Sequence, residues 1–354
     1  MATIVMGRIG QVFISLQQIR KVPKMLTEAM PSMHDTIRDA EVPSYFREHY
    51  VCTGYRPLNQ NWRYYFLSMF QRHNETINIW THLLAFVVFL FKLIQLSEVV
   101  DFVSDPHSWP LLILILSSLT YTAFSVAAHL LGGKSELCHY TFYFLDYVGV
   151  AQYQYGSAAV HFYYGVDDSL YRHVHGIFMP IATVLSCLSC LGCCYGKYCN
   201  QTLPAWVSKV CKVLPSAVAY IWDSSPVFKR LLFWSTASSD PALIYHFGQV
   251  AFFLSCAFFF TFPMLERCFP GRCDFVGQSH QIFHIFLSCC TLCQIHASYL
   301  DYVGRRKLYS SLHSSTDSAF FVLLYAVTLV LCALIVAVLL RKVKQVLDFK
   351  AKSK

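Results

Sequence analysis

The sequence AFFVLLYAVTLVLCALIVAVLL, which runs from Ala319 to Leu340, contains 22 residues and no charged side chain. About 20 consecutive apolar residues are enough for an α-helix to cross the hydrocarbon core of a bilayer. Seven further apolar segments precede this one: Trp80 to Leu96, Pro110 to Leu131, His139 to Tyr164, Gly176 to Tyr195, Val210 to Trp222, Tyr245 to Pro263 and Gly277 to Tyr302. The fifth is the weakest, because it is short and contains Pro215. Together the segments predict an all-α integral membrane protein.

The composition of the whole chain agrees with this class. Of the 354 residues, 55% are apolar or aromatic and only 14% are charged, whereas roughly a quarter of the residues of a soluble domain are charged. The net charge of +8 does not indicate binding of nucleic acid, because the basic residues gather before the first apolar segment and after the last one. We therefore expect a membrane protein that has no nucleic-acid partner.

Charged residues in the short loops predict the orientation of the chain in the membrane. Basic side chains flank the set of segments at both ends: Arg56, Arg63, Arg72, Arg341, Lys342 and Lys344. The first loop is acidic instead, with Glu98, Asp101 and Asp105. Since Lys and Arg are enriched in cytoplasmic loops, both ends of the chain are predicted to lie in the cytosol, which requires an even number of spans. Three basic residues oppose this topology, because alternation places them outside: Arg305, Arg306 and Lys307.

These features divide the chain into four regions. Residues 1–73 are predicted to form a cytoplasmic N-terminal region, 74–304 a seven-helix membrane core, 305–340 a loop with an eighth helix, and 341–354 a basic cytoplasmic tail. Apolar residues between Ile9 and Ile19 also fall at helical spacing. That pattern predicts an amphipathic helix, which either lies on a membrane surface or packs on the protein itself.

Ionisable side chains inside predicted spans are costly in a bilayer and therefore indicate function. Ser125 and His129 are four residues apart near the end of the second span, and His280 and His284 are four residues apart at the start of the seventh. Asp146 lies two turns into the third span. With a rise of 1.5 Å per residue, all five side chains are predicted to lie in one layer, roughly 3 to 10 Å from the cytosolic ends of their spans.

Three imidazoles and a carboxylate in one dehydrated layer predict a zinc site. His129, His280 and His284 would supply nitrogen ligands and leave a fourth position for water, with Asp146 bound directly or through that water. Ser125 would orient His129 or the water. The alternative is a hydrogen-bonded cluster that only holds the helices together, and the spacing leaves this alternative open.

Other polar residues of the spans carry weaker signals. Glu75, Asn78 and His82 fall on one helical face and predict a structural polar cluster. Gln152 and Gln154 either join helices or line a ligand pocket, and the sequence does not decide between these roles. Three further histidines are interpreted as residues without a role in a site: His161, His246 and His296.

Four motifs, in this order along the chain, resemble the progestin and adiponectin receptor family. They are Arg72-His73-Asn74-Glu75-Thr76-Ile77-Asn78-Ile79-Trp80-Thr81-His82, Ser125-x3-His129, Asp146-Tyr147-Val148-Gly149 and His280-x3-His284. The resemblance extends from about Tyr50 to Tyr302. Three shorter stretches are similar to the membrane progestin receptor branch: Thr53-Gly54-Tyr55-Arg56-Pro57, Lys134-Ser135-Glu136-Leu137 and Phe269-Pro270-Gly271.

The resemblance implies a seven-helix core of the adiponectin-receptor type with a cytosolic N-terminus, and an eighth helix added in the progestin branch. In the adiponectin branch zinc is held by three histidines, and the resemblance implies that these correspond to His129, His280 and His284, with the aspartate at Asp146 and the serine at Ser125. For the progestin branch it implies a progestogen ligand, membrane lipids around the protein, and signalling from the plasma membrane through an inhibitory heterotrimeric G protein, including a role in oocyte maturation.

Two functions from different classes follow. A receptor would hold a steroid in the helical bundle. The steroid would bind the two conformational states of the receptor with unequal affinity and so shift the equilibrium between them. A zinc-dependent intramembrane lipid hydrolase of the ceramidase type would use Asp146 as base and Ser125 as orienting group. We expect the receptor, which is not an enzyme, because the branch-level resemblance indicates it, and we keep the hydrolase as the alternative. The oligomeric state is not predicted.

Overall fold

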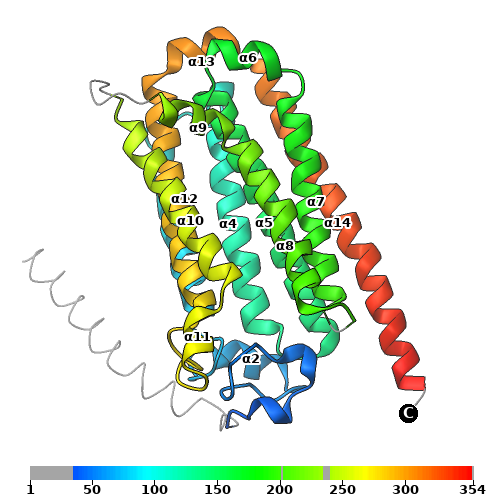
Figure 1. Ribbon diagram of the computed structural model, residues 1–354. Coiled ribbons are helices and arrows are strands. Elements are labelled where there is room, and N and C mark those ends of the chain that lie inside the picture. The colour runs from blue at the N-terminus through cyan, green and yellow to red at the C-terminus, as the bar shows by residue number, and fades with distance from the viewer. Residues whose placement is uncertain (1–34, 201, 234–239, 353–354) are drawn as a thin grey trace, which may run out of the picture.

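The computed structural model describes residues 35–200, 202–233 and 240–352 (Figure 1). The amphipathic helix predicted between Ile9 and Ile19 lies outside the described residues. Within them the chain is helical and has no strand, and its one isolated β-bridge joins Ile37 to Tyr55. The predicted fold class, an all-α integral membrane protein that crosses the bilayer several times, is confirmed.

Eight helices of the described chain are long enough to run through the bundle. They are α3 (Thr76–Ser97), α4 (Trp109–Leu131), α5 (Glu136–Gly165), α7 (Phe178–Tyr198), α8 (Ala205–Asp223), α10 (Ala242–Thr261), α12 (Ser279–Gly304) and α14 (Ser315–Lys352). Six of these satisfy both the length and the hydropathy of a membrane span, and the other two are α5 and α8. The eight segments predicted from the sequence coincide with these eight helices.

Helix α5 is less apolar than its neighbours because it occupies the centre of the bundle. It contacts α4, α7, α8, α9 (Ser225–Leu232), α12 and α14, so its polar and aromatic side chains meet protein instead of lipid. At Gly149 the backbone of α5 approaches α4 so closely that an added Cβ would lie 2.7 Å from Cα of Tyr121. A central helix can carry this composition because its polar groups lie inside the protein and not against lipid.

The bundle has two distinct ends, which we name from Figure 1. The lower end carries residues 35–75, with α2 (Trp62–Ser68), together with α11 (Met264–Cys268) and the C-terminus. The upper end carries α6 (Asp168–Val174), α9 and α13 (Arg306–Leu312). Both ends of the described chain therefore lie at the lower end, which agrees with an even number of crossings.

Helix α14 is the longest element. Its 38 residues correspond to roughly 57 Å at 1.5 Å per residue, which exceeds the roughly 30 Å of a bilayer core. It packs on α5 and α7 through a buried cluster of Phe144, Val148, Ala151, Cys190, Cys194, Cys332, Val336, Leu339 and Val343. The eighth helix is thus attached to the middle of the bundle along most of its length.

A short segment of the N-terminal region closes the lower end. The buried Asp274 carboxylate accepts hydrogen bonds from the backbone N–H groups of Cys52 and Thr53 and from the Thr53 hydroxyl, at 2.6 to 3.1 Å. Gly54 has φ of +88°, and a Cβ there would lie 2.9 Å from the ring of Phe275. This glycine therefore permits both the turn and the close contact between residues 52–56 and the α11–α12 connection.

The upper end is held by a buried ion-pair network. Arg230 of α9 donates two hydrogen bonds to the two carboxylate oxygens of Asp301, at 2.7 and 2.9 Å, and a third at 2.8 Å to Asp240. His246 Nε2–H donates to Asp301 at 2.8 Å, while the Gln249 amide donates to His246 Nδ1 at 2.7 Å. These contacts join α9, α10 and α12. His246, interpreted from the sequence as a residue without a role in a site, is a member of the network.

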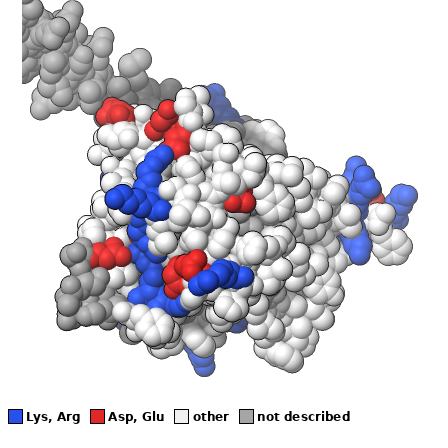
Figure 2. Space-filling view, turned by 90° about the horizontal axis from the view of Figure 1, so that it is seen from above, with Lys and Arg blue, Asp and Glu red and all other residues white. Residues whose placement is uncertain are grey.

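Two of the three basic residues that opposed the predicted topology, Arg305 and Arg306, have hydrogen-bond partners at the upper end. Arg306 donates to Asp105 at 2.8 Å, and Arg305 donates to the backbone carbonyls of Tyr164 and Val166 at the C-terminal end of α5. Seen from above, the basic side chains form a band across the upper end with acidic side chains beside it (Figure 2). Lys229 and Arg306 are therefore paired with acidic residues of the same end, Asp167 and Asp105.

Candidate metal centre

Three histidines from two helices meet near the lower end of the bundle. His129 comes from the last turns of α4, and His280 and His284 come from the first turns of α12. One ring nitrogen of each lies within 4.8 Å of the others, and Nε2 of His129 is 3.4 Å from Nε2 of His280. Two nitrogens bound at 2.0–2.1 Å to one tetrahedral zinc ion are about 3.3 Å apart. The arrangement is therefore close to that of three zinc ligands.

The remaining ring nitrogens are oriented by side chains of α3. Nδ1–H of His129 donates to the carboxylate of Glu75 at 2.7 Å. The Thr81 hydroxyl donates to the carbonyl of Asn78, so its oxygen accepts the hydrogen bond from Nδ1–H of His284 at 3.1 Å. These bonds leave Nε2 of both rings unprotonated and available to a metal. Hydrogen-bonded histidines of this kind are typical of zinc sites.

The polar cluster predicted on α3 is part of this centre. Glu75 accepts a hydrogen bond from the Asn78 amide at 2.6 Å in addition to the one from His129. The ring of His82 stacks on that of His284, with 3.6 Å between centroids, and neither of its nitrogens has a hydrogen-bond partner among the described residues. The three residues on one face of α3 therefore support the histidines of α4 and α12.

Asp146 and Ser125 flank the three histidines without joining them. Asp146 of α5 interacts electrostatically with His129, but its carboxylate is not among the described groups within 4.8 Å of one another. Ser125 is buried one turn before His129 on α4. The structure thus brings all five residues of the predicted layer to one region of the bundle, with the three nitrogen donors closest together.

Arg56 fixes the end of the helix that carries His129, a role that the sequence analysis missed. Its buried guanidinium donates to the backbone carbonyls of His129 and Leu130 and to the Ser68 hydroxyl, at 2.6 to 2.8 Å. A cation at these carbonyls also interacts favourably with the negative end of the α4 dipole.

Burial and the nearby Arg56 charge lower the pKa of His73 well below its ordinary value, so His73 is neutral.

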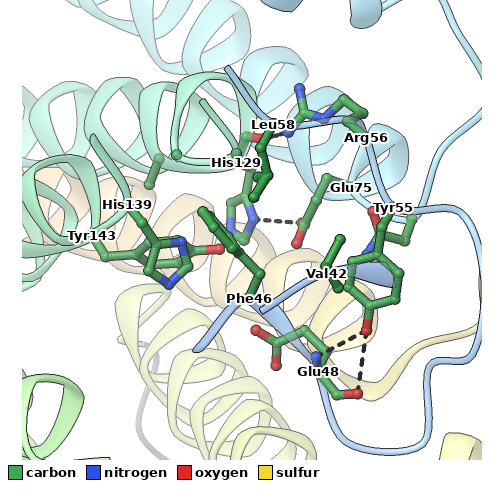
Figure 3. Close-up of a pocket in the computed structure, with 14 residues that line it drawn as sticks. Val42, Phe46, Glu48, Tyr55, Arg56, Leu58, Glu75, His129, His139 and Tyr143 are labelled. Carbon is green, nitrogen blue, oxygen red and sulfur yellow. Dashed lines mark hydrogen bonds and ion pairs between the residues drawn. The ribbon is translucent and has the colours of Figure 1, made fainter. Parts of the chain in front are cut away.

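A small cavity of about 40 Å³ adjoins the centre on the side of the N-terminal region (Figure 3). Its lining includes His129 and Glu75 at the centre, His139 and Tyr143 of α5, and Glu48 of the N-terminal region. Since one buried water needs roughly 10–15 Å³, this cavity holds only a few water molecules. It is far smaller than the roughly 300–1,000 Å³ of pockets for drug-sized ligands.

The remaining predicted residues lie elsewhere. Gln152 is buried in α5, and neither atom of its amide has a hydrogen-bond partner among the described residues. The Gln154 amide donates to the Ser216 carbonyl of α8 at 3.4 Å. His161 contacts Gln249 and Gln294 near the upper network, and the ring of His296 packs on Tyr245. None of these four side chains belongs to the three-histidine group.

The donor set of the centre fits zinc. Zinc prefers nitrogen, sulfur and carboxylate ligands, and three protein ligands with one open position are usual where it takes part in catalysis. Here three imidazole nitrogens converge, two of them with their second nitrogen already donating to an oxygen. A cluster that only joined helices would not need these nitrogens turned toward one point.

Replacing Glu75 by glutamine is expected to weaken zinc binding by about 10- to 100-fold, because outer partners of ligating histidines contribute that much to affinity. The glutamine carbonyl still accepts from His129, but the negative charge beside the ring is lost. Competition with a chelator of known affinity measures the change. Glu98→Gln, at the exposed other end of α3, is the control and should leave affinity unchanged. Equal affinity in Glu75→Gln and the unmodified protein would contradict this role.

The fold and the centre together define a multi-pass helical membrane protein with a buried three-histidine site. A family model described as haemolysin-III related matches residues 70–295. Membrane progestin receptor alpha-B of Danio rerio is 54% identical over 316 residues, which cover 88% of this chain and 89% of that protein. Membrane progestin receptor beta of Sus scrofa is 46% identical, with 97% of each chain covered. Membrane progestin receptor alpha of Homo sapiens is 48% identical over 87% of this chain and 88% of its own length.

The chain therefore belongs to the haemolysin-III-related family and, within it, to the membrane progestin receptors. This confirms the resemblance found in the four sequence motifs. The family match begins just before the Arg72 motif and ends after His284, so it contains every residue of the three-histidine centre.

Proposed function

We propose that this protein is a receptor for a progestogen steroid in the plasma membrane. The observation that carries the proposal is the identity of 46 to 54% to proteins named membrane progestin receptors over most of the chain. Signalling through an inhibitory heterotrimeric G protein, and a role in oocyte maturation, are part of this proposal. The basic residues that flank the spans support cytosolic N- and C-termini.

The steroid site is distinct from the cavity beside the histidines in its present shape, because that cavity is too small for a rigid four-ring ligand. Gln152 is a candidate contact, since its buried amide has a donor and an acceptor without partners, and burial without hydrogen bonds is costly. A steroid ketone would accept the hydrogen bond that this amide leaves unmade. Binding that favours one arrangement of the bundle would then shift the conformational equilibrium.

We further propose that His129, His280 and His284 hold zinc. Zinc bound there would supply a Lewis acid inside the bundle. Glu75 and Thr81 would keep the histidines in the ligating tautomer, and Arg56 would hold the end of α4 in register with α12. Asp146 would bind the zinc ion directly or through a water molecule. A zinc ion that only links α4 to α12 is compatible with the receptor.

The second candidate function is zinc-dependent hydrolysis of a lipid amide or ester. The observation that favours it is the combination of three converging histidines, which would leave a fourth zinc position for water, and a carboxylate, Asp146, nearby. In this function Asp146 would take a proton from water and Ser125 would orient the reacting group. The same three histidines serve either function, so only an assay separates them.

Purified protein should be assayed for progestogen binding and for ceramide turnover, each with and without His284→Ala. We expect saturable steroid binding by the unmodified protein and no turnover above that of the His284→Ala variant. His296→Ala, on the same helix but outside the centre, is the control for handling and folding. Turnover that disappears in His284→Ala and persists in His296→Ala would favour the hydrolase over the receptor.

A further inference from the structure

Two of the three histidines, His129 and His284, are closed off from solvent, and the third, His280, is partly buried. His129 and His284 are 2% and 1% exposed, and the helices around them run into the hydrophobic part of the bundle. The cavity described above touches His129 and Glu75 at its inner end, and it also touches Glu48, whose side chain is exposed at the lower end. The lining thus extends from two residues of the centre to an exposed residue of the N-terminal region, and Figure 3 labels all three: His129, Glu75 and Glu48.

The wall of this cavity carries an imidazole nitrogen with no assigned use. His139 is only 4% exposed, and its Nε2 has no hydrogen-bond partner among the described residues. The backbone carbonyl of Gly132 hydrogen-bonds to the same ring. A ring that donates from Nδ1 leaves Nε2 as an acceptor. An acceptor buried without a partner is costly, which indicates that something with positive charge or a donor occupies the cavity.

The other polar groups of the lining also suit a cation. Glu48 and Glu75 are carboxylates, and Arg56 is the only lysine or arginine among the described residues that line the space. The guanidinium of Arg56 is already engaged with the carbonyls of His129 and Leu130 and with Ser68. Imidazole nitrogen and carboxylate oxygen are both good ligands for divalent transition metals. A volume of about 40 Å³ also leaves room for an ion that keeps part of its hydration.

We propose that this cavity is the route by which a divalent transition-metal ion reaches the three histidines, with Glu48 and His139 as transient ligands along it. The inference rests on the proposed zinc centre. Along the route the ion exchanges water molecules first for the Glu48 carboxylate at the rim, then for His139 Nε2 in the wall, and finally for the histidines. No electron is transferred. Each step makes one metal–ligand bond as a metal–water bond, or the bond to the preceding transient ligand, breaks.

The test measures the rate of metal loading. Full-length protein in detergent is first stripped of metal with a chelator. It is then mixed with Co²⁺ alone, and loading is followed by the ligand-field absorption of tetrahedral cobalt. Loading with Zn²⁺ is followed separately with a chelating dye. His139→Leu and Glu48→Gln are expected to load about tenfold more slowly, equivalent to about 1.4 kcal/mol in the barrier. Both variants should reach the same final stoichiometry as the unmodified protein.

Two nearby substitutions are matched controls. His49→Leu and Glu41→Gln change exposed residues of the same N-terminal region that do not line the cavity, and both should load at the unmodified rate. Loading at that rate by both His139→Leu and Glu48→Gln would overturn the access route and leave the zinc centre intact. A lowered final stoichiometry in either variant would also overturn it, because the residue would then stabilise the bound state. An unmodified protein that binds neither Co²⁺ nor Zn²⁺ would reject the zinc centre itself.

Discussion

Purified protein with His280→Ala is expected to contain almost no zinc, whereas the unmodified protein should contain about one zinc per chain. His280 Nε2 faces His129 Nε2 at 3.4 Å, so its removal takes away one of three converging nitrogens. Outer partners of a ligand contribute about 10- to 100-fold to affinity, and loss of a direct ligand should cost more than that. Elemental analysis after dialysis against a weak chelator gives the stoichiometry.

His280 is the most informative of the three positions. Its side chain is only partly buried, so alanine leaves a smaller void than it would at His129 or His284. His296→Ala is the matched control, because His296 lies on the same helix and is also half-buried but packs on Tyr245. It should retain the zinc of the unmodified protein. Full zinc content in His280→Ala, with its fold intact, would show that these histidines do not hold the metal.

The second large effect is expected at the upper end. Arg230→Met should lower the free energy of unfolding by about 3–5 kcal/mol, because it leaves the buried Asp301 carboxylate without its cationic partner. Asp301 is 2% exposed as a side chain and accepts two hydrogen bonds from Arg230. For a chain of this size the loss corresponds to a fall in Tm of roughly 10 °C. Thermal unfolding in detergent, followed by a thiol-reactive dye or intrinsic fluorescence, measures it.

An exposed ion pair provides the control for Arg230→Met. Arg172 pairs with Asp168 four residues earlier on α6, and both side chains are more than half exposed. Arg172→Met should therefore change Tm by less than about 2 °C. Adding Asp301→Leu to Arg230→Met should recover part of the lost stability, because the unpaired charge is removed as well. A similar loss of Tm in Arg172→Met and Arg230→Met would contradict the importance of burial.

Much of the histidine centre could be predicted, because helical periodicity fixes both the face and the depth of a residue. His280 and His284 are four residues apart, so they share a face, and the distance of His129 from the end of its span places it at the same height. The same periodicity grouped Glu75 with Asn78 and His82. It could not show that Glu75 contacts His129, because the rotation of one helix relative to another depends on packing between them.

The residues that the sequence analysis missed lie where no periodic pattern exists. Arg56 and Glu48 belong to a segment with only short helical turns, whose position depends on Asp274, more than 200 residues later in the chain. His246 was interpreted as a residue without a role in a site, and its partners, Arg230 and Asp301, come from other helices. His139 stands at the start of α5, and the cavity that it lines is completed by Glu48 of the N-terminal region. Long-range contacts of this kind leave no local signal in the sequence.

The unbroken course of α14 has a mechanical consequence. A stiff rod about 57 Å long that is attached along the bundle and extends past it converts a small rotation into a large movement of its far tip. If the rod turns by 10° together with the helices on which it packs, its two ends shift relative to each other by roughly 10 Å. Any rearrangement of the bundle that reorients this rod would therefore produce a larger displacement of its tip in the aqueous phase at the opposite face. A soluble partner there could detect that displacement.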